Sequence, residues 1–149
     1  MSSGQYPDAI DPNSVGTYPP IAKAGGGYVW DAVLEYRVWC HPERGAPDLE
    51  EGNDYFHSFA NYQEAAAFSD RTDCAEDPLA LILQEEFIDE PKVGHYVHVK
   101  QSRVAEWSVT FLSRPRRTPT TIADFLASNA PHNRLEILRG TEQPRNGRW

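Results

Sequence analysis

The stretch DYFHSFANYQEAAAFS, residues 54–69, changes from the two-residue period of a strand to the 3.6-residue period of a helix. Aromatic side chains alternate along residues 54–60, which indicates a strand. Asn61 follows as an N-cap, and Glu64 three residues later completes a capping-box pattern. Alanines in the helix allow it to approach a sheet closely. We expect Ser58 to face this helix across a filled core, so that the stretch is scaffold.

Alternating or continuous apolar residues on both sides of this stretch predict further strands. They are expected at residues 33–41, 79–83, 95–100 and 103–112. Residues 79–83 form an unbroken apolar run, which is typical of a central strand buried on both faces. Residues 101–102 are either a turn between the last two strands or a bulge within one long strand, and residues 89–94 are expected to be a loop.

A second helix is predicted near the C-terminus. Thr118 is its cap and Pro119 its first residue, and Pro131 ends it. The order strand, strand, helix, strand, strand, strand, helix predicts an α+β fold. We expect a mainly antiparallel sheet of four to five strands with two helices on one face, and a ferredoxin-like arrangement is our specific guess.

The chain divides into an arm, a domain and a tail. Residues 1–27 contain four prolines and few apolar residues, which predicts an extended flexible arm. Residues 28–139 are a single α+β domain, and residues 140–149 a loose C-terminal tail. The anchor points expected for the arm are Tyr6, Ile10, Tyr18 and Ile21. Residues 42–53 form a polar loop of a length that is often functional.

Composition narrows the classes of partner. The formal charge of −8 argues against a nucleic-acid partner, which requires clustered basic residues. No apolar run reaches the roughly 20 residues of a membrane span. The first residues lack the basic and apolar regions of a signal peptide, so we expect a soluble, cytoplasmic protein.

Cysteine and histidine spacing gives no metal or thiol site. The two cysteines form neither a disulfide framework nor a zinc pattern, and Cys40 falls on an apolar strand face, where we expect a buried, inert thiol. His95 and His98 are three residues apart, which on a strand places them on opposite faces. We therefore expect no metal.

Three polar residues form a candidate catalytic set. Arg37 lies on one strand, Ser58 precedes the capped helix, and Glu86 lies in the Gln84-Glu85-Glu86 sequence that follows the apolar strand. This order resembles that of Arg–Ser–Glu ADP-ribosyltransferases. The resemblance implies that the Arg holds the phosphates of NAD, the Ser its nicotinamide end, and the Glu an oxocarbenium-like transition state. The Ser-Thr-Ser triplet of that family is absent here.

A second resemblance is to small uncharacterised bacterial proteins that are often labelled GCN5-related N-acetyltransferases. It rests on residues 28–30, 35–45, 54–69 and 114–119. It implies acetyl-CoA as the cofactor. That class cradles the pyrophosphate of coenzyme A in a glycine-rich turn at a helix N-terminus, and the sequence contains no such turn.

Aromatic residues give our first interpretation of function. Alternation predicts that Trp30, Trp39, Tyr55 and Trp107 partly face outward near Arg37, as in a protein-binding patch. We interpret the chain as a small binding domain without enzymatic activity, whose arm and aromatic strand face contact a protein partner or a second copy. The acetyltransferase and ADP-ribosyltransferase readings are the alternatives.

Overall fold

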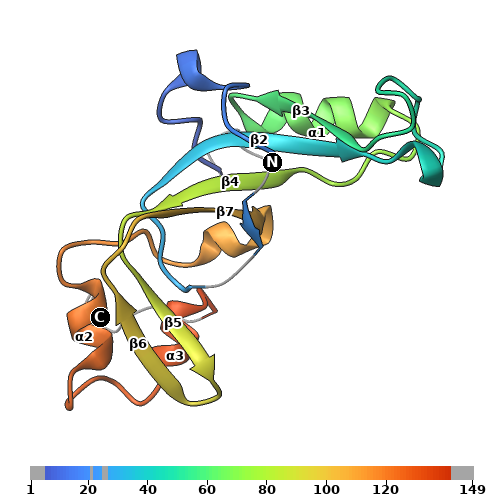
Figure 1. Cartoon of the computed structure of the whole chain (residues 1–149). Coiled ribbons are helices and arrows are strands. Elements are labelled where there is room, and N and C mark those ends of the chain that lie inside the picture. The colour runs from blue at the N-terminus through green and yellow to red at the C-terminus, as the bar shows by residue number, and fades with distance from the viewer. Residues whose placement is uncertain (1–5, 21, 25–26, 142–149) are drawn as a thin grey trace.

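The computed structural model of the chain describes residues 6–20, 22–24 and 27–141 (Figure 1). Its strands are β1 (Lys23–Ala24), β2 (Ala32–Cys40), β3 (Tyr55–Phe59), β4 (Leu79–Gln84), β5 (Phe87–Lys92), β6 (His95–Val99) and β7 (Arg103–Ser108). Its α-helices are α1 (Tyr62–Arg71), α2 (Thr121–Leu126) and α3 (Arg134–Leu138), and its 3₁₀ helices are η2 (Pro12–Ser14), η3 (Pro42–Arg44) and η4 (Val109–Ser113). This composition confirms the α+β class.

The main sheet has five strands in the order β1-β7-β4-β2-β3. All neighbours are antiparallel except β1 and β7, which are parallel. The mainly antiparallel sheet is therefore confirmed, as is the central place of the strand expected at residues 79–83, because β4 lies between β7 and β2. The short β1 comes from the arm, where the residue pattern predicts no strand.

Strands β4 to β7 form one long bent ribbon rather than separate hairpins. Gln84 pairs with Arg103 at the end of the main sheet, and Phe87 pairs with Val99 at the start of the two-stranded sheet. Figure 1 shows β5 and β6 turning away from the main sheet at this bend. Residues 101–102 lie at the bend, between β6 and β7. The loop expected at residues 89–94 is instead the end of β5 and the turn that follows it.

The N-terminus of α1 forms as its sequence predicts. The Asn61 side chain accepts a hydrogen bond of 2.9 Å from the Glu64 backbone N–H. The helix packs over β2 and β3, and the Phe68 ring lies against His57 and Phe59, with centroid distances of 4.6 and 5.5 Å. Because β3 alternates, Ser58 points to the opposite face, so the expectation that Ser58 faces α1 is wrong.

Two groups of buried side chains hold the fold together. The larger lies between the main sheet, α1 and η4, and its members include Tyr36, Ile82 and Trp107. The smaller joins the β5–β6 hairpin to α2 and α3 through Ile88, Phe125 and Leu138. The second helix thus covers the hairpin and not the main sheet. This distinguishes the fold from the ferredoxin-like guess. The feature that the two share is that β3 and β4 run parallel to each other on either side of β2 and are joined through α1.

The described part of the arm lies on the domain. Tyr6 packs against Tyr62 at a centroid distance of 4.7 Å, and the Tyr36 hydroxyl donates to the Pro7 carbonyl at 2.6 Å. Ile10 is held by its backbone N–H, which donates to Val33, while its side chain is 68% exposed. The expected anchor Ile21 and tail residues 142–149 lie outside the described residues.

Helix length bears on membrane insertion. Within the described ranges, no helix has the length and apolar character needed to cross a bilayer.

Candidate functional site

Glu35 and Arg37 form a buried ion pair on the sheet face opposite α1. Both side chains are fully buried, and Arg37 Nε donates to Glu35 Oε2 at 2.7 Å. Glu106 on β7 supplies a second carboxylate, 3.0 Å from Arg37 Nη1. The Phe56 ring lies 4.2 Å from the guanidinium carbon. Two acids therefore surround one base in a water-excluded position.

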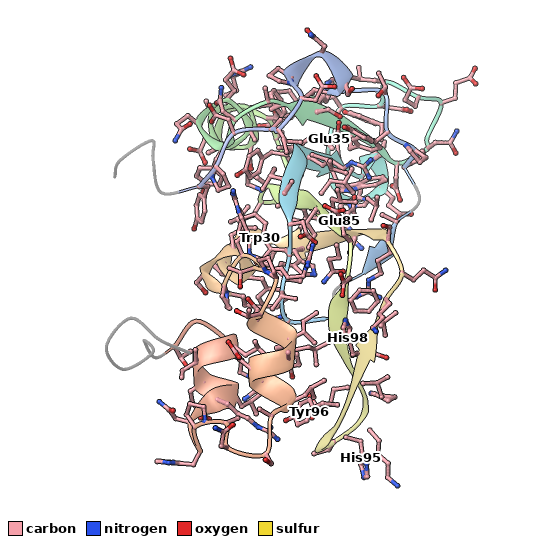
Figure 2. The ribbon with its side chains drawn as sticks, turned by 90° about the vertical axis from the view of Figure 1, so that its left-hand side faces the viewer. Trp30, Glu35, Glu85, His95, Tyr96 and His98 are labelled. Carbon is pink, nitrogen blue, oxygen red and sulfur yellow. The ribbon has the colours of Figure 1, made fainter. Side chains whose placement is uncertain are left out.

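The arm completes this buried cluster. The Pro19 and Pro20 carbonyls accept from Arg37 at 2.6 and 3.4 Å, and the Gly16 N–H donates to Glu35 at 2.8 Å. Arg37 thus donates hydrogen bonds to two carboxylates and two carbonyls of its own chain. Figure 2 shows Glu35 enclosed within the upper part of the molecule. The cation expected to bind a partner or a phosphate is buried instead, because the arm closes over it.

Of the candidate catalytic set, two residues come together and the third does not. The Ser58 hydroxyl donates to Glu35 at 3.2 Å, and Ser58 pairs with Arg37 across the β2–β3 ladder. Arg37 also lies opposite Leu79, at the start of β4, whereas Glu86 follows the end of β4. Five steps along β4 of about 3.3 Å each separate its two ends by roughly 17 Å. Glu86 therefore does not share a site with Arg37 and Ser58.

Glu86 belongs to a separate surface cluster at the bend of the ribbon. His98 Nε2 lies 2.7 Å from Glu86 Oε1, and Arg117 Nη1 lies 3.6 Å from Glu86 Oε2. The hydrogen bond from His98, followed by the charge of Arg117, lowers the pKa of Glu86. Figure 2 shows His98 on the hairpin, well below Glu35, and His95 at the hairpin tip.

A groove at the outer edge of the main sheet is the best candidate for a binding site. Its volume is about 330 Å³, near the lower end of ligand pockets. Four segments line it: the arm, β2, the loop 42–53 and the start of β3. The lining residues are Pro20, Trp39, Leu49, Glu50, Asp54, Tyr55, Phe56 and His57.

The groove combines rings, an exposed apolar side chain and acids. Trp39 and Tyr55 are half-buried, and Trp39 Nε1 is fixed by donating to Glu106 at 2.9 Å. Leu49 is 60% exposed, which makes it one of the most exposed large apolar side chains of the described chain. Glu50 and Asp54 add carboxylates. Rigid rings with a polar rim are the usual composition of a protein contact site.

His41 joins the groove to the adjoining loop. Its Nε2 lies 2.5 Å from Glu76 Oε2, and its Nδ1 lies 2.9 Å from Asp54 Oδ1. Asp54 raises the pKa of His41 most, burial opposes it, and Glu76 adds to the rise. A protonated His41 therefore links the start of β3 to the segment before β4.

The aromatic residues expected to face outward divide into two groups. Trp39 and Tyr55 line the groove, whereas Trp30 and Trp107 are 4% and 1% exposed and lie in the main core, so the expectation that these two face outward is wrong. Alternation could not reveal this, because helix η4, which directly follows β7, covers the face on which Trp107 lies. Sequence reasoning missed Pro20, Leu49 and Glu50, although the length and polarity of the loop 42–53 had marked it.

Cysteine chemistry and metal binding are weak candidates. Burial raises the pKa of the Cys40 thiol, and Cys40 is fully buried. Among the residues that the structure describes, no group of three or more His, Cys, Asp and Glu side chains is placed to hold a metal ion. In the comparisons with known proteins, no protein-family model, curated protein or solved structure matches the chain.

Proposed function

We propose that the chain is a small, non-enzymatic interaction domain of the cytoplasm, and that the groove beside β3 binds a segment of a partner protein. The groove carries this proposal, because it joins two half-buried rings to the exposed Leu49 in a cavity of about 330 Å³. It is built by two strands together with the arm and the loop. The arm and the loop have little regular secondary structure. The two free cysteines fit a reducing compartment.

The enzymatic alternatives have less support. The hypothesis of an ADP-ribosyltransferase-like NAD enzyme requires a free Arg37 near Glu86. Arg37 instead donates hydrogen bonds to Glu35, Glu106 and the arm. The acetyl-CoA reading rests on a resemblance that lacks the coenzyme-binding turn. A ligand that binds only the native state raises its melting temperature. We expect neither acetyl-CoA nor NAD at millimolar concentration to raise it, and a clear rise with either would favour that enzyme class.

A peptide selection tests the groove directly. Random displayed peptides about ten residues long, roughly twice the length of β3, are selected on the whole chain. Binding is then compared in two variants that each replace an exposed apolar residue by an acid. Leu49→Asp changes the groove, whereas Val93→Asp changes a residue that is 93% exposed at the tip of the hairpin.

The two variants separate a loss of peptide binding at the groove from a general effect of an added surface charge. We expect selected peptides to lose binding to Leu49→Asp by about tenfold or more, as for an interface anchor, and to keep binding to Val93→Asp. Both variants should melt like the parent chain, because both residues are exposed. If no selected peptide depends on Leu49, the groove is not the binding site and the proposal fails.

A further inference from the structure

We infer that the partner is a basic, extended segment that pairs with the free edge of β3, so that a lysine or arginine side chain lies over the rings of the groove. This inference rests on the proposed function and adds the conformation and the charge of the partner. Two independent observations carry it: the unpaired edge of β3, which the groove reaches, and the charge around the groove.

The conformation follows from the lining of the groove. Asp54, Tyr55, Phe56 and His57 are consecutive, and along a strand consecutive side chains point to opposite faces. A groove that contacts all four therefore reaches the edge of β3, and Trp39 and Phe56, which lie opposite each other on β2 and β3, show that it also covers the sheet face of Arg37. Within the described residues, β3 pairs with β2 alone and is the last strand of the sheet. An unpaired strand edge is a template for an added strand.

The arm and the loop leave this edge open while bordering it. The arm meets the chain just beyond β3, where Ala9 N–H donates to the Ala60 carbonyl at 2.7 Å. The loop is held beside the start of β3 by the Tyr55 hydroxyl, which donates to the Pro47 carbonyl at 2.7 Å. The two contacts lie at opposite ends of a five-residue strand, which leaves room for about five residues of a partner between them.

The charge of the partner follows from the acids at the groove. Glu50 and Asp54 line it, and Asp54 is 46% exposed. Beneath the groove, Arg37 is matched by two carboxylates, Glu35 and Glu106, so the formal charge of the buried cluster is also negative. Trp39 offers a ring on the sheet face of Arg37 and Tyr55 offers one on the opposite face, and a cation over either ring is stabilised by about 0.5–2 kcal/mol.

The same charges disfavour a second copy of the chain as the occupant. Two copies joined through β3 would form a two-fold contact in which the same patch meets itself. Each copy carries a formal charge of −8 and brings the acids of its own loop to that edge. A basic partner meets complementary charge instead, which also accelerates association at low salt.

The test uses the peptides that depend on Leu49. We expect them to be enriched in Lys and Arg at alternate positions, because alternate side chains of an added strand share one face. N-methylation of single backbone nitrogens should weaken binding about five- to tenfold at every second residue and little at the residues between, because only alternate N–H groups point toward β3.

Charge is tested by a matched pair of variants. Glu50→Gln should weaken the basic peptides several-fold, whereas Glu43→Gln, the same change outside the groove, should not. Peptides that depend on Leu49 but lack basic residues, or that tolerate N-methylation throughout, overturn this inference and leave the proposed function standing. A chain that dimerises, and that Leu49→Asp makes monomeric, identifies a second copy as the occupant and also overturns it.

Discussion

Replacing Arg37 by methionine should destabilise the fold strongly. Met keeps much of the volume of the side chain but removes the charge, so Glu35 is left fully buried without its cation. The Pro19 and Pro20 carbonyls lose their donor at the same time. The substitution therefore acts both on the sheet and on the attachment of the arm.

The size of the effect can be worked out from the structure. Removing one partner of a buried ion pair costs about 3–5 kcal/mol. Arg44 is the control, because it also pairs with a carboxylate, Glu76 at 3.2 Å, but its side chain is 64% exposed. An exposed pair of this kind contributes about 0–1 kcal/mol, so Arg44→Met should be almost neutral.

Urea unfolding measures the difference in stability between Arg37→Met and Arg44→Met. With an m value of about 2 kcal/mol per molar urea, a loss of about 4 kcal/mol lowers the midpoint by about 2 M. The double variant Glu35→Leu, Arg37→Met removes both charges and should recover part of this loss, because apolar side chains can replace a buried pair at little cost. An Arg37→Met midpoint within about 0.5 M of the parent would refute the reasoning.

Two further substitutions test the ion pairs of His41 and the close contact between Gly140 and Ser113. The raised pKa of His41 means that protonation stabilises the fold below its ordinary pKa of about 6.5, and that this contribution is lost as the pH rises through the raised value. His41→Asn should therefore lower the unfolding free energy more at about pH 5.5 than at pH 8.5, and a difference that does not change with pH would contradict the ion pairs with Asp54 and Glu76. Gly140 has φ of 77°, and an added Cβ would lie 2.3 Å from the Ser113 carbonyl oxygen, whereas Gly52, with φ of 85°, has open space around it. Gly140→Ala should cost about 1–3 kcal/mol more than Gly52→Ala in thermal unfolding, and equal costs would show that backbone conformation alone matters.

Local patterns predicted the elements well. The alternation of β2, the apolar run of β4 and the Asn61 cap each depend on neighbours in sequence, and each forms as expected. Strand β5 was missed because Pro91 and its acidic neighbours are typical of a loop, although an edge strand tolerates them. Strand β1 was missed because two residues carry no period.

The candidate site could be predicted only in part. Trp39 was found because alternation places it on the face opposite the buried Val38 and Cys40, whereas Tyr55 shares the face of Cys40 and was found as an aromatic residue at the start of a strand. The burial of Arg37 could not be foreseen, because it depends on Glu106 and on the arm, which are distant from Arg37 in sequence and meet it only in the fold. Glu86 was grouped with Arg37 because the sequence does not show the register in which β2 pairs with β4, and that register places Arg37 opposite the start of β4.

The attachment of the arm sets the order in which the chain can fold during synthesis. Strand β1 pairs with β7, and the arm closes over Arg37 beside Glu106, also on β7. The arm is synthesised before β7 and must therefore wait until β7 has emerged from the ribosome before it finds its place. Contacts so distant in sequence slow folding. The acids and rings around Arg37 stay uncovered during that interval, and the arm, although made before the domain, is among the last parts to be fixed.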